Sequence, residues 1–570
     1  MKNVVNFNYV ILEQRKEKNV IKRYFTRLKT EFSGYNGKKF GKDLLAGITV
    51  AAVALPLALA FGVSSGADAA SGLVTALLAG LIIGALSGAS YQISGPTGAM
   101  SAILISLVAQ YQLQGVFVAC LISGIILLIC GIFKLGGLVS FIPTPVITGF
   151  TSGIAVIIAL GQINNLTGFT SQGETTIDKI ASYFTTPQEL NLTALLIGVA
   201  VIIFMFIYPK KWNSVVPSSL VAIILATIAN FIFNFDVQIV GAIPQSLFLD
   251  ERLDLGAFDW SNIGNLIVPG VSIAALGLIE SLLCGASAGR MKNEKLDSDI
   301  ELVAQGIGNI VIPFFGGVPA TAAIARTSVA IKAGGQTRLT SIIHSVVLLL
   351  SMFLLGGVMS KIPLAALAGV LIVTAIRMNE TEAIKDFFGR KIKTAMFQFL
   401  ITMAATVIFD LTIAILIGVI FSIFMFVLKV SEMTVGVDGI HAEAYKDNPT
   451  AQKKFEKTKV IYITGPLYFG TASKLEQKLS EISDDNTETI IFSVRGVSVA
   501  DLSGVRVLDD ICTGLLKDNK TIYFSCVQPQ VSEMFTRSGL EEKIGKENFF
   551  WSTDKVLNFM LDAKEAAAAN

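Results

Sequence analysis

Almost no charge interrupts the chain once its opening residues are passed. The 127 positions of residues 44–170 hold two charged side chains, Asp68 and Lys134. Over all 570 residues the charged fraction is 15%, whereas soluble domains carry roughly 25%. An apolar stretch of about 20 residues crosses a bilayer as a helix, because a helix bonds its own backbone polar groups. The sequence therefore excludes a wholly soluble or disordered chain and predicts a polytopic α-helical membrane protein.

The distribution of charge predicts three domains. Residues 1–43 form a basic arm with eleven Lys or Arg and four Asp or Glu, and this arm lacks the apolar core of a signal peptide. Residues 44–432 form the membrane domain, and residues 433–570 have the composition of a soluble domain. In the arm, Val20, Tyr24 and Leu28 recur at helical spacing and predict a helix on the membrane surface. A solvated basic tail is the alternative.

Apolar stretches predict about fourteen membrane segments, two of them short. They lie at roughly 44–63, 70–88, 96–110, 115–133, 145–166, 192–208, 216–232, 268–288, 301–315, 320–332, 339–358, 362–376, 393–409 and 411–431.

The charge of the loops predicts the orientation, because basic loops stay on the cytoplasmic side. Basic loops follow the sixth, tenth and twelfth segments (Lys210, Lys211; Lys332, Arg338; Arg377, Arg390, Lys391, Lys393). Acidic loops follow the fifth and seventh segments (Glu174, Asp178, Glu189; Asp236, Asp250, Glu251, Asp254, Asp259). This alternation agrees with about fourteen spans and predicts that both termini are cytoplasmic.

An internal repeat indicates how the membrane domain is built. Gly47–Gly66 and Gly270–Gly289 are identical at eight of twenty positions, at an offset of 223 residues. Pro96 and Pro319 lie at the same offset. In transporters built from inverted repeats, interrupted helices at matching positions mark the binding site. Each half is therefore expected to supply one long helix and one broken helix.

The broken helices predict an anion site. We expect half-helices to start at Pro96 and Pro319, since Pro suits the first position of a helix, after extended stretches at Tyr91–Gly95 and Phe315–Val318. Their ends would offer unpaired N–H groups and positive dipole ends to an anion. Small residues there let a ligand approach the backbone (Thr97, Gly98, Ala99, Ala320, Thr321 and Ala322).

Two ionisable residues lie within apolar segments, which makes them functional candidates because burying a charge in a membrane is costly. Arg326 cannot be neutralised and is expected about two turns into the half-helix from Pro319, where it would hold an anion. Glu280 can be neutralised, and it would carry a proton or ligate sodium. The alternative is an ion pair between the two that locks their helices. For His344, packing is favoured over a role in a proton relay.

Residues 433–570 predict a small α/β domain. Strands are expected at 458–465, 488–495 and 521–526, and helices at 472–482 and 504–516. Asp501-Leu502-Ser503-Gly504 falls at a strand-to-helix turn, where Asp or Ser caps the helix. Phosphorylation of Ser503 is the alternative, because a helix N-terminus favours an anion. The five cysteines and two histidines are scattered, and they predict neither a disulfide framework nor a metal site.

Several motifs together resemble the SulP, or sulfate permease, family of anion transporters. They are ISGPTGAM (93–100), GLIESLL (277–283), ELVAQGIGN (301–309) and FFGGVPATAAIARTSVAIKAGG (314–335). IYITGPLYFG (461–470) and DLSG (501–504) resemble a STAS domain. The resemblance covers about residues 40–560.

The resemblance implies fourteen segments in a 7+7 inverted repeat, as in the uracil-transporter fold, divided into a mobile core and a gate that move in an elevator-like way. It implies no enzymatic activity, no cofactor beyond a coupling proton or sodium ion, and no nucleic-acid partner. It also implies a homodimer among plasma (inner) membrane lipids, with a possible cytoplasmic partner at the STAS domain. The substrate residues would be Pro96, Thr97, Gly98, Ala99, Ala322, Ala323, Ile324, Ala325 and Arg326, and the ion-coupling residues Glu280 and Cys284.

Departures from the family pattern bear on the substrate. Many sulfate permeases carry Gln after the proline of the first helix, where this chain has Leu57. The sodium-coupled bicarbonate branch carries Asp and Thr where this chain has Glu280 and Cys284. We therefore expect proton-coupled symport of a C4-dicarboxylate, bicarbonate or sulfate, in that order. A passive exchanger or channel, sodium-coupled bicarbonate uptake, and signalling through the STAS domain are the alternatives.

Overall fold

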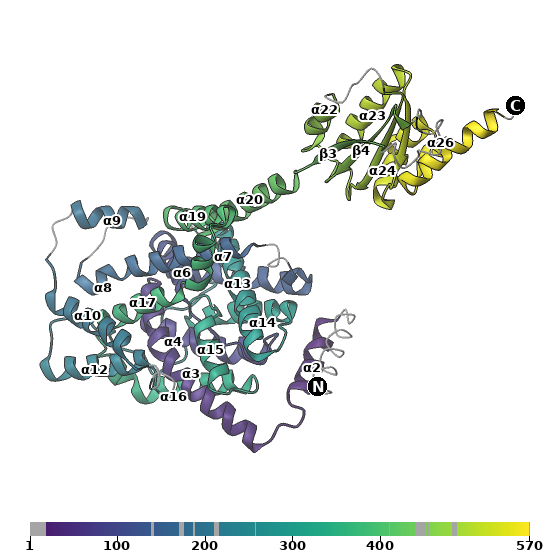
Figure 1. Ribbon diagram of the computed structural model, residues 1–570. Helices are drawn as coiled ribbons and strands as arrows, with labels where there is room; N and C mark the ends of the chain where they lie inside the picture. Colours follow the sequence, from purple (N-terminus) through teal and green to yellow (C-terminus); the bar gives the residue numbers. More distant parts are fainter. Residues whose placement is uncertain are drawn as a thin grey trace. The chain divides into compact units, whose positions relative to one another are not determined.

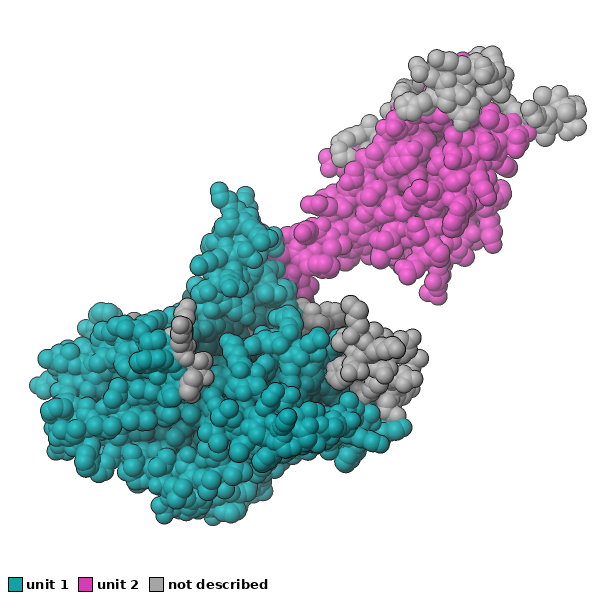
Figure 2. Space-filling model, turned by 60° about the horizontal axis from the view of Figure 1, so that its bottom comes forward, with its two compact units in different colours: residues 1–421 teal, residues 422–570 magenta. Residues whose placement is uncertain are grey.

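The computed structural model describes residues 19–137, 142–169, 176–185, 189–209, 212, 216–256, 258–409, 411–440, 452, 455–480 and 487–568. Glu174, Lys210, Lys211 and residues 1–18 of the basic arm lie outside these ranges. The chain divides into two compact units, residues 1–421 and 422–570 (Figure 2).

The fourteen predicted segments all coincide with helices or helix limbs (Figure 1). Their bounds are α3 (Gly37–Ser64), α4 (Ala69–Leu78) with the π-helical turn η1 (Ala79–Ile83) and α5 (Gly84–Leu86), α6 (Gly98–Ile132), α7 (Thr144–Gly161) with α8 (Ile163–Thr167), α10 (Leu192–Ile207), α12 (Ser218–Phe233), α13 (Ile263–Lys292), α14 (Ser298–Val311), α15 (Ile324–Lys332), α16 (Leu339–Met359), α17 (Leu364–Met378), α19 (Lys393–Ile408) and α20 (Leu411–Val430). Shorter elements are α9 (Thr176–Thr185), α18 (Thr381–Gly389) and the 3-10 turns η3 (Trp260–Asn262) and η4 (Ile312–Phe315).

Six helical segments in the described ranges are long and apolar enough to cross a membrane, and α10, α12, α19 and part of α20 are shorter apolar helices. On α10 and α12 the large apolar side chains point outward as well as inward. Phe206 and Ile207 are 55% and 74% exposed, and Phe231 and Ile232 are 69% and 66% exposed. A helix that is apolar all round and exposed fits lipid better than water.

The helix α6 accounts for two predicted segments. Its 35 residues would extend about 52 Å at 1.5 Å per residue, well beyond the roughly 30 Å of a bilayer core. The helix breaks at Gln112, where the backbone is non-helical at φ 57° and ψ 179°. The first limb, residues 98–111, is therefore about 21 Å long at the same rise, too short to cross the bilayer core alone.

The contacts between helices follow an inverted repeat in which equivalent helices of the two halves exchange partners. The first predicted segment (α3) packs on the eleventh segment (α16). The eighth segment (α13) packs on α6, the second limb of which is the fourth segment. In the same way α7 packs on α19, and α17 packs on α10. We call α3, α4, α6 and α13–α16 the core helices, and α7, α10, α12, α17, α19 and α20 the gate helices.

The helix α2 (Val20–Glu31) packs against the core helices through ion pairs. Arg23 Nη2 lies 3.2 Å from Asp297 and 2.9 Å from Asp299. Glu31 receives two hydrogen bonds from the guanidinium of Arg338, at 2.9 and 2.7 Å. The expectation of a solvated tail is therefore wrong for residues 20–31, because buried ion pairs hold this helix on the protein.

The second unit is a five-stranded sheet in the order β3-β4-β5-β6-β7. Its strands are β3 (Thr434–Gly439), β4 (Thr458–Thr464), β5 (Thr489–Gly496), β6 (Thr521–Ser525) and β7 (Phe549–Phe550), and only the β3–β4 pairing is antiparallel. The predicted strands coincide with β4, β5 and β6. The sequence analysis missed β3, which is largely exposed, and β7, which has two residues.

Helices cover both faces of this sheet (Figure 1). Phe492 and Phe524 face the helices α22 (Ala472–Ser480), α23 (Leu502–Lys517), α24 (Pro529–Ser538) and α25 (Leu540–Ile544). Val460 and Ile491, on the opposite face, pack against α26 (Thr553–Ala568). Successive side chains of a strand point to opposite faces, so parallel strands covered on both sides are apolar at every position.

Two glycines allow α3 and α4 to touch by their backbones. A Cβ added at Gly72 would lie 2.0 Å from the carbonyl oxygen of Ala58 and 2.7 Å from the Cα of Gly62. Overpacking of this kind costs about 1–3 kcal/mol. We predict that Gly72→Ala lowers the apparent melting temperature of the detergent-solubilised protein, measured from its monodisperse chromatographic peak.

The matched control is Gly357→Ala on α16, where an added Cβ meets no atom within 4 Å. Because Ala is the better helix former, this variant should keep or raise the melting temperature. Equal melting temperatures for both variants would contradict the prediction.

Candidate functional site

Two short strands from opposite halves of the repeat meet inside the membrane unit. β1 (Ser94–Gly95) pairs antiparallel with β2 (Thr321–Ala322), with Ser94 opposite Ala322. All four residues are buried. Each strand leads into a helix, so the pairing places the N-termini of α6 and α15 near each other.

The second half-helix starts later than the sequence predicts. Pro96 directly follows β1, and α6 begins at Gly98 behind the cap Thr97. Pro319 instead precedes β2, and α15 begins at Ile324. The residues at Phe315–Val318 contain a 3-10 turn and a left-handed Gly316 rather than the extended stretch. The two prolines are therefore not structural counterparts, and the helix starts lie 226 residues apart (Gly98 and Ile324).

The start of α6 is capped and closely packed. Thr97 Oγ1 accepts a hydrogen bond from the N–H of Met100 at 3.3 Å. Gly98 and Ala99 are buried in the first turn. A Cβ on Gly98 would lie 2.3 Å from Ile158 of α7 and 3.2 Å from Phe61 of α3. Glycine at this position thus leaves the space that the end of the Ile158 side chain occupies.

The start of α15 places Arg326 in its first turn, not two turns along. Ala322 belongs to β2, and the N–H of the cap Ala323 bonds the carbonyl of Ile93 at 2.9 Å. Ile324 and Ala325 are exposed, whereas Arg326 is 1% exposed. The N–H groups of a helix's first turn have no partner within the helix. The cationic side chain thus lies beside the positive end of its own helix.

The guanidinium of Arg326 lies against β1. Its Nη2 donates to the carbonyl oxygen of Pro96. A Cβ on Gly95 would lie 2.5 Å from Nη1 and 3.2 Å from Cζ, so glycine makes room for the guanidinium. Nη1 is buried and has no hydrogen-bond partner in the described part of the chain. A buried donor of a charged group without a partner is rare and points to a ligand.

Glu280 approaches the same place from α13. Its Oε2 accepts a hydrogen bond from Thr97 Oγ1 at 2.9 Å. Within the described residues no ion pair joins Glu280 to Arg326 at 4.0 Å or less. The structure thus brings Thr97, Glu280 and Arg326 together at the two half-helices without a locking salt bridge.

Neither Cys284 nor His344 forms a hydrogen bond with the Glu280 carboxylate in the described chain. The thiol of Cys284 is buried and donates to Thr327 Oγ1 at 3.4 Å. His344 on α16 is fully buried, and neither ring nitrogen has a hydrogen-bond partner among the described residues. A Cβ on Gly80, at the π-helical turn, would lie 2.9 Å from His344 Nδ1. His344 thus packs against the π-helical turn η1 that follows α4.

In the second unit, Asp501 and not Ser503 caps the helix α23. Asp501 Oδ1 accepts from the N–H of Gly504 at 2.8 Å, and Oδ2 accepts from the N–H of Phe469 at 3.1 Å. Ser503 is the second residue of α23 and is exposed.

The cysteine on the same helix is a packing residue. Burial raises the pKa of the Cys512 thiol, so it is not a nucleophile.

Uncharged polar residues around the strands were missed by the sequence analysis. Ser281 Oγ lies 2.8 Å from Thr321 Oγ1, and Gln92 Nε2 donates to the carbonyl of Ser281 at 2.8 Å. Gln305 and Asn309 of α14 also contact the strand segments. The available signal was a polar residue inside an apolar segment, but serine and threonine are common in membrane helices and stand out less than charges.

A cavity of about 300 Å³ lies elsewhere, among the gate helices. Asn165, Gly168, Asn191, Gln238 and Ala365 line it, and neither Arg326 nor Glu280 reaches it. We place the candidate site at the half-helices because the unpartnered charge lies there. In the described ranges, no group of three or more His, Cys, Asp or Glu side chains is placed to hold a metal ion.

Comparison with known proteins identifies both units. Residues 40–405 match the sulfate permease family, and residues 450–556 match the STAS domain. The chain is 35% identical over 543 residues to the putative sulfate transporter YvdB of Bacillus subtilis, covering 93% of this chain and 99% of that protein. It is 27% identical over 536 residues to the bicarbonate transporter BicA of Picosynechococcus, covering 90% and 94%.

Solved structures agree with this fold. The transmembrane domain of a cyanobacterial bicarbonate transporter BicA matches with a TM-score of 0.61 and 28% identity, over 68% of this chain and 98% of that one. Murine Slc26a9 has a TM-score of 0.81 at 18% identity, over 93% of each chain, and shows the fold alone. From the match across the membrane unit and the STAS domain that follows it, the chain belongs to the sulfate permease family of membrane transporters.

Proposed function

We propose that this protein is a secondary active transporter that binds a small oxyanion between the N-termini of α6 and α15. The proposal is supported chiefly by the burial of Arg326. Its side chain is 1% exposed, and its Nη1 has no hydrogen-bond partner in the described chain. A buried charge is stable in a membrane protein only when something balances it. An anion at the two helix ends would supply that balance.

The local charges favour coupling to protons. Each helix N-terminus acts as about half a positive charge, so the two ends and Arg326 together offer about two positive charges. An ionised Glu280 cancels one of them, and a protonated Glu280 cancels none. Binding of a dianion and binding of a proton at Glu280 therefore support each other, which is the condition for symport.

The names of the relatives favour sulfate or bicarbonate as the substrate. YvdB is described as a putative sulfate transporter and BicA as a bicarbonate transporter. Both anions present oxygen atoms that a guanidinium fork and backbone N–H groups recognise. A C4-dicarboxylate carries the same chemistry at each end and stays the third candidate.

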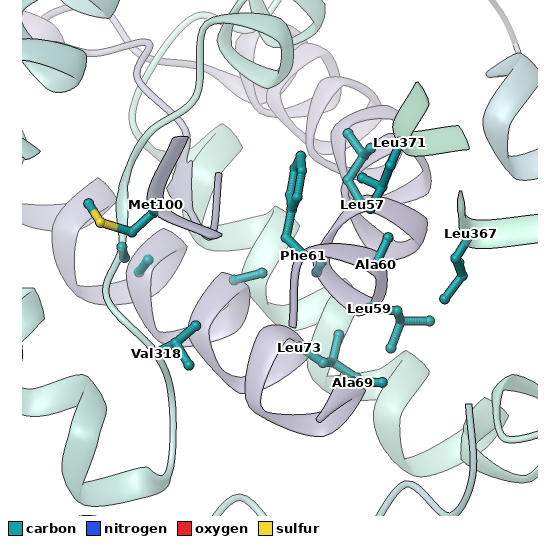
Figure 3. Packing of buried hydrophobic residues seen from close by; sticks show 14 of the residues in the cluster. Leu57, Leu59, Ala60, Phe61, Ala69, Leu73, Met100, Val318, Leu367 and Leu371 are labelled. Carbon is teal, nitrogen blue, oxygen red and sulfur yellow. The ribbon is translucent and has the colours of Figure 1, made fainter. Parts of the chain in front are cut away.

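An elevator-like movement is supported by the surface between the core and gate helices. Leu57 and Leu59 of α3 pack toward Leu371 and Leu367 of α17 within one apolar cluster (Figure 3). In the described part of the chain, no hydrogen bond or ion pair joins α3 or α6 to α7 or α17. Apolar surfaces without directional bonds can slide past each other without breaking any.

Three further features belong to the proposal. Both termini are cytoplasmic in the plasma membrane, the protein acts as a homodimer, and the STAS domain receives a cytoplasmic partner, with Ser503 as a phosphorylation site. If residues 436–570 serve only signalling, their deletion leaves uptake unchanged and abolishes the response to the partner.

We predict that Arg326→Ala weakens anion binding without unfolding the protein. Losing hydrogen bonds to a charged group costs about 1.5–3 kcal/mol, which corresponds to a Kd roughly 10- to 100-fold weaker. Gly95→Ala should act in the same direction, because its Cβ would displace the guanidinium. Calorimetry of the purified protein with sulfate and with bicarbonate measures both effects.

Arg290→Ala is the control, since Arg290 is an exposed arginine at the end of α13. It should bind the anion as the unaltered protein does. Normal binding by a folded Arg326→Ala protein would remove the anion site from Arg326.

We predict that Glu280→Gln abolishes the response of uptake to an inward proton gradient. The amide oxygen still accepts the hydrogen bond of Thr97, so the site keeps its shape while it loses the titratable group. Uptake of labelled sulfate, bicarbonate and a C4-dicarboxylate into proteoliposomes, with and without proton and sodium gradients, measures the effect.

Glu382→Gln, an exposed glutamate on α18, should leave the proton response unchanged. A full proton response in Glu280→Gln would disprove symport through this residue. Uptake driven by sodium in the unaltered protein would favour the sodium-coupled alternative, and uptake indifferent to both gradients would favour a passive exchanger or channel.

A further inference from the structure

One face of α14 is polar and completely buried. Glu301, Gln305 and Asn309 recur every four residues and therefore lie on the same side of the helix. Their exposed fractions are 0%, 0% and 1%. Burying three polar side chains is costly unless each is hydrogen-bonded, so their partners show what this face holds.

Asn309 holds the segment that leads into β2. Its Oδ1 accepts from the N–H of Ala320 at 2.8 Å, and its Nδ2 donates to the carbonyl of Ala320 at 2.9 Å. The side-chain amide thus takes the place of a neighbouring strand. On α4, Thr75 Oγ1 holds Val318 in a similar way, since it accepts from the N–H of Val318 at 2.8 Å and lies 3.1 Å from its carbonyl oxygen.

Gln305 and Glu301 hold the segment that leads into β1. Gln305 Nε2 donates to Ser94 Oγ at 3.1 Å and to Glu301 Oε1 at 2.9 Å. Glu301 Oε2 accepts from Ser87 Oγ at 2.6 Å and from the N–H of Gly88 at 3.0 Å. A single helix therefore bonds both chain segments that enter the site from opposite halves of the repeat.

The strands carry this constraint to the anion site. Ser94 is paired with Ala322, and the next residue, Gly95, is the one against which the Arg326 guanidinium lies. In the described chain, no hydrogen bond or ion pair joins the three α14 side chains to Arg326, Thr97 or Glu280. We infer that Glu301, Gln305 and Asn309 are positioning residues that set the separation of the two half-helix ends, and so the affinity for one oxyanion over another.

This inference rests on the proposed function and predicts a specific kinetic signature. The half-helix ends contact the anion in its bound state, so a change in their separation alters KM and the order of preference among anions. Turnover at saturation, which depends on movement of the core helices as a body, should stay within about twofold. A misplacement of a positioning group by 1 Å can reduce the rate of an enzyme about 100-fold. For the α14 variants we expect KM to rise about tenfold.

The test compares Asn309→Asp with Asn309→Ala and Gln305→Ala. In Asn309→Asp the acceptor for the N–H of Ala320 stays, and the donor to its carbonyl is lost. Initial rates of sulfate and bicarbonate uptake over a range of concentrations give KM and kcat, normalised to folded protein in the membrane. Thr406→Val is the control, because its buried hydroxyl bonds the carbonyl of Thr402 in its own helix and no other group in the described chain.

We expect the α14 variants to raise KM and change the sulfate-to-bicarbonate ratio, and Thr406→Val to change neither. If they lower only the amount of folded protein, or lower kcat at unchanged KM, the positioning role is overturned. Arg326→Ala separates this failure from that of the proposed function. If Arg326→Ala loses anion binding while the α14 variants keep the KM of the unaltered protein, only the positioning role is overturned. If Arg326→Ala binds the anion normally, the proposed anion site itself is overturned.

Discussion

A backbone group that leaves a helix inside a bilayer finds no water to bond, and the centre of this protein is arranged around that constraint. The chain leaves helical conformation twice at depth, before α6 and before α15. The two extended segments bond each other as β1 and β2, and the side chains of Thr75 and Asn309 bond the residues in front of β2. Because these bonds are made within the protein, the following helices can start inside the membrane unit.

The electrostatics of the site follow from where those helices start. Each start contributes a positive dipole end, and Arg326 adds a full charge in the first turn of α15. Gly95 leaves room for the guanidinium, whose Nη2 is bonded by Pro96. Glu280 is held by Thr97, and in the described chain no ion pair joins it to Arg326.

The core and gate helices differ in how they are held. Within the core, polar side chains bond helix to strand, as Asn309 and Gln305 do. Between core and gate, the helices α3 and α17 meet through leucine side chains (Figure 3). This difference supports the proposed displacement of one group of helices against the other.

The sequence by itself determined the membrane segments, the inverted repeat and the α/β nature of the C-terminal domain, because hydrophobic length and periodicity are local properties of the chain. It also singled out Glu280 and Arg326, since a charge in an apolar segment is visible without a structure. The start of α15 at Ile324, the place of Cys284 beside Thr327 and the bonds of α2 to Arg338 were decided only by tertiary structure. Each depends on a partner far away in the chain. A strand forms after Pro319, where a helix was expected to start, because β1 lies beside it, and no local pattern records that neighbour.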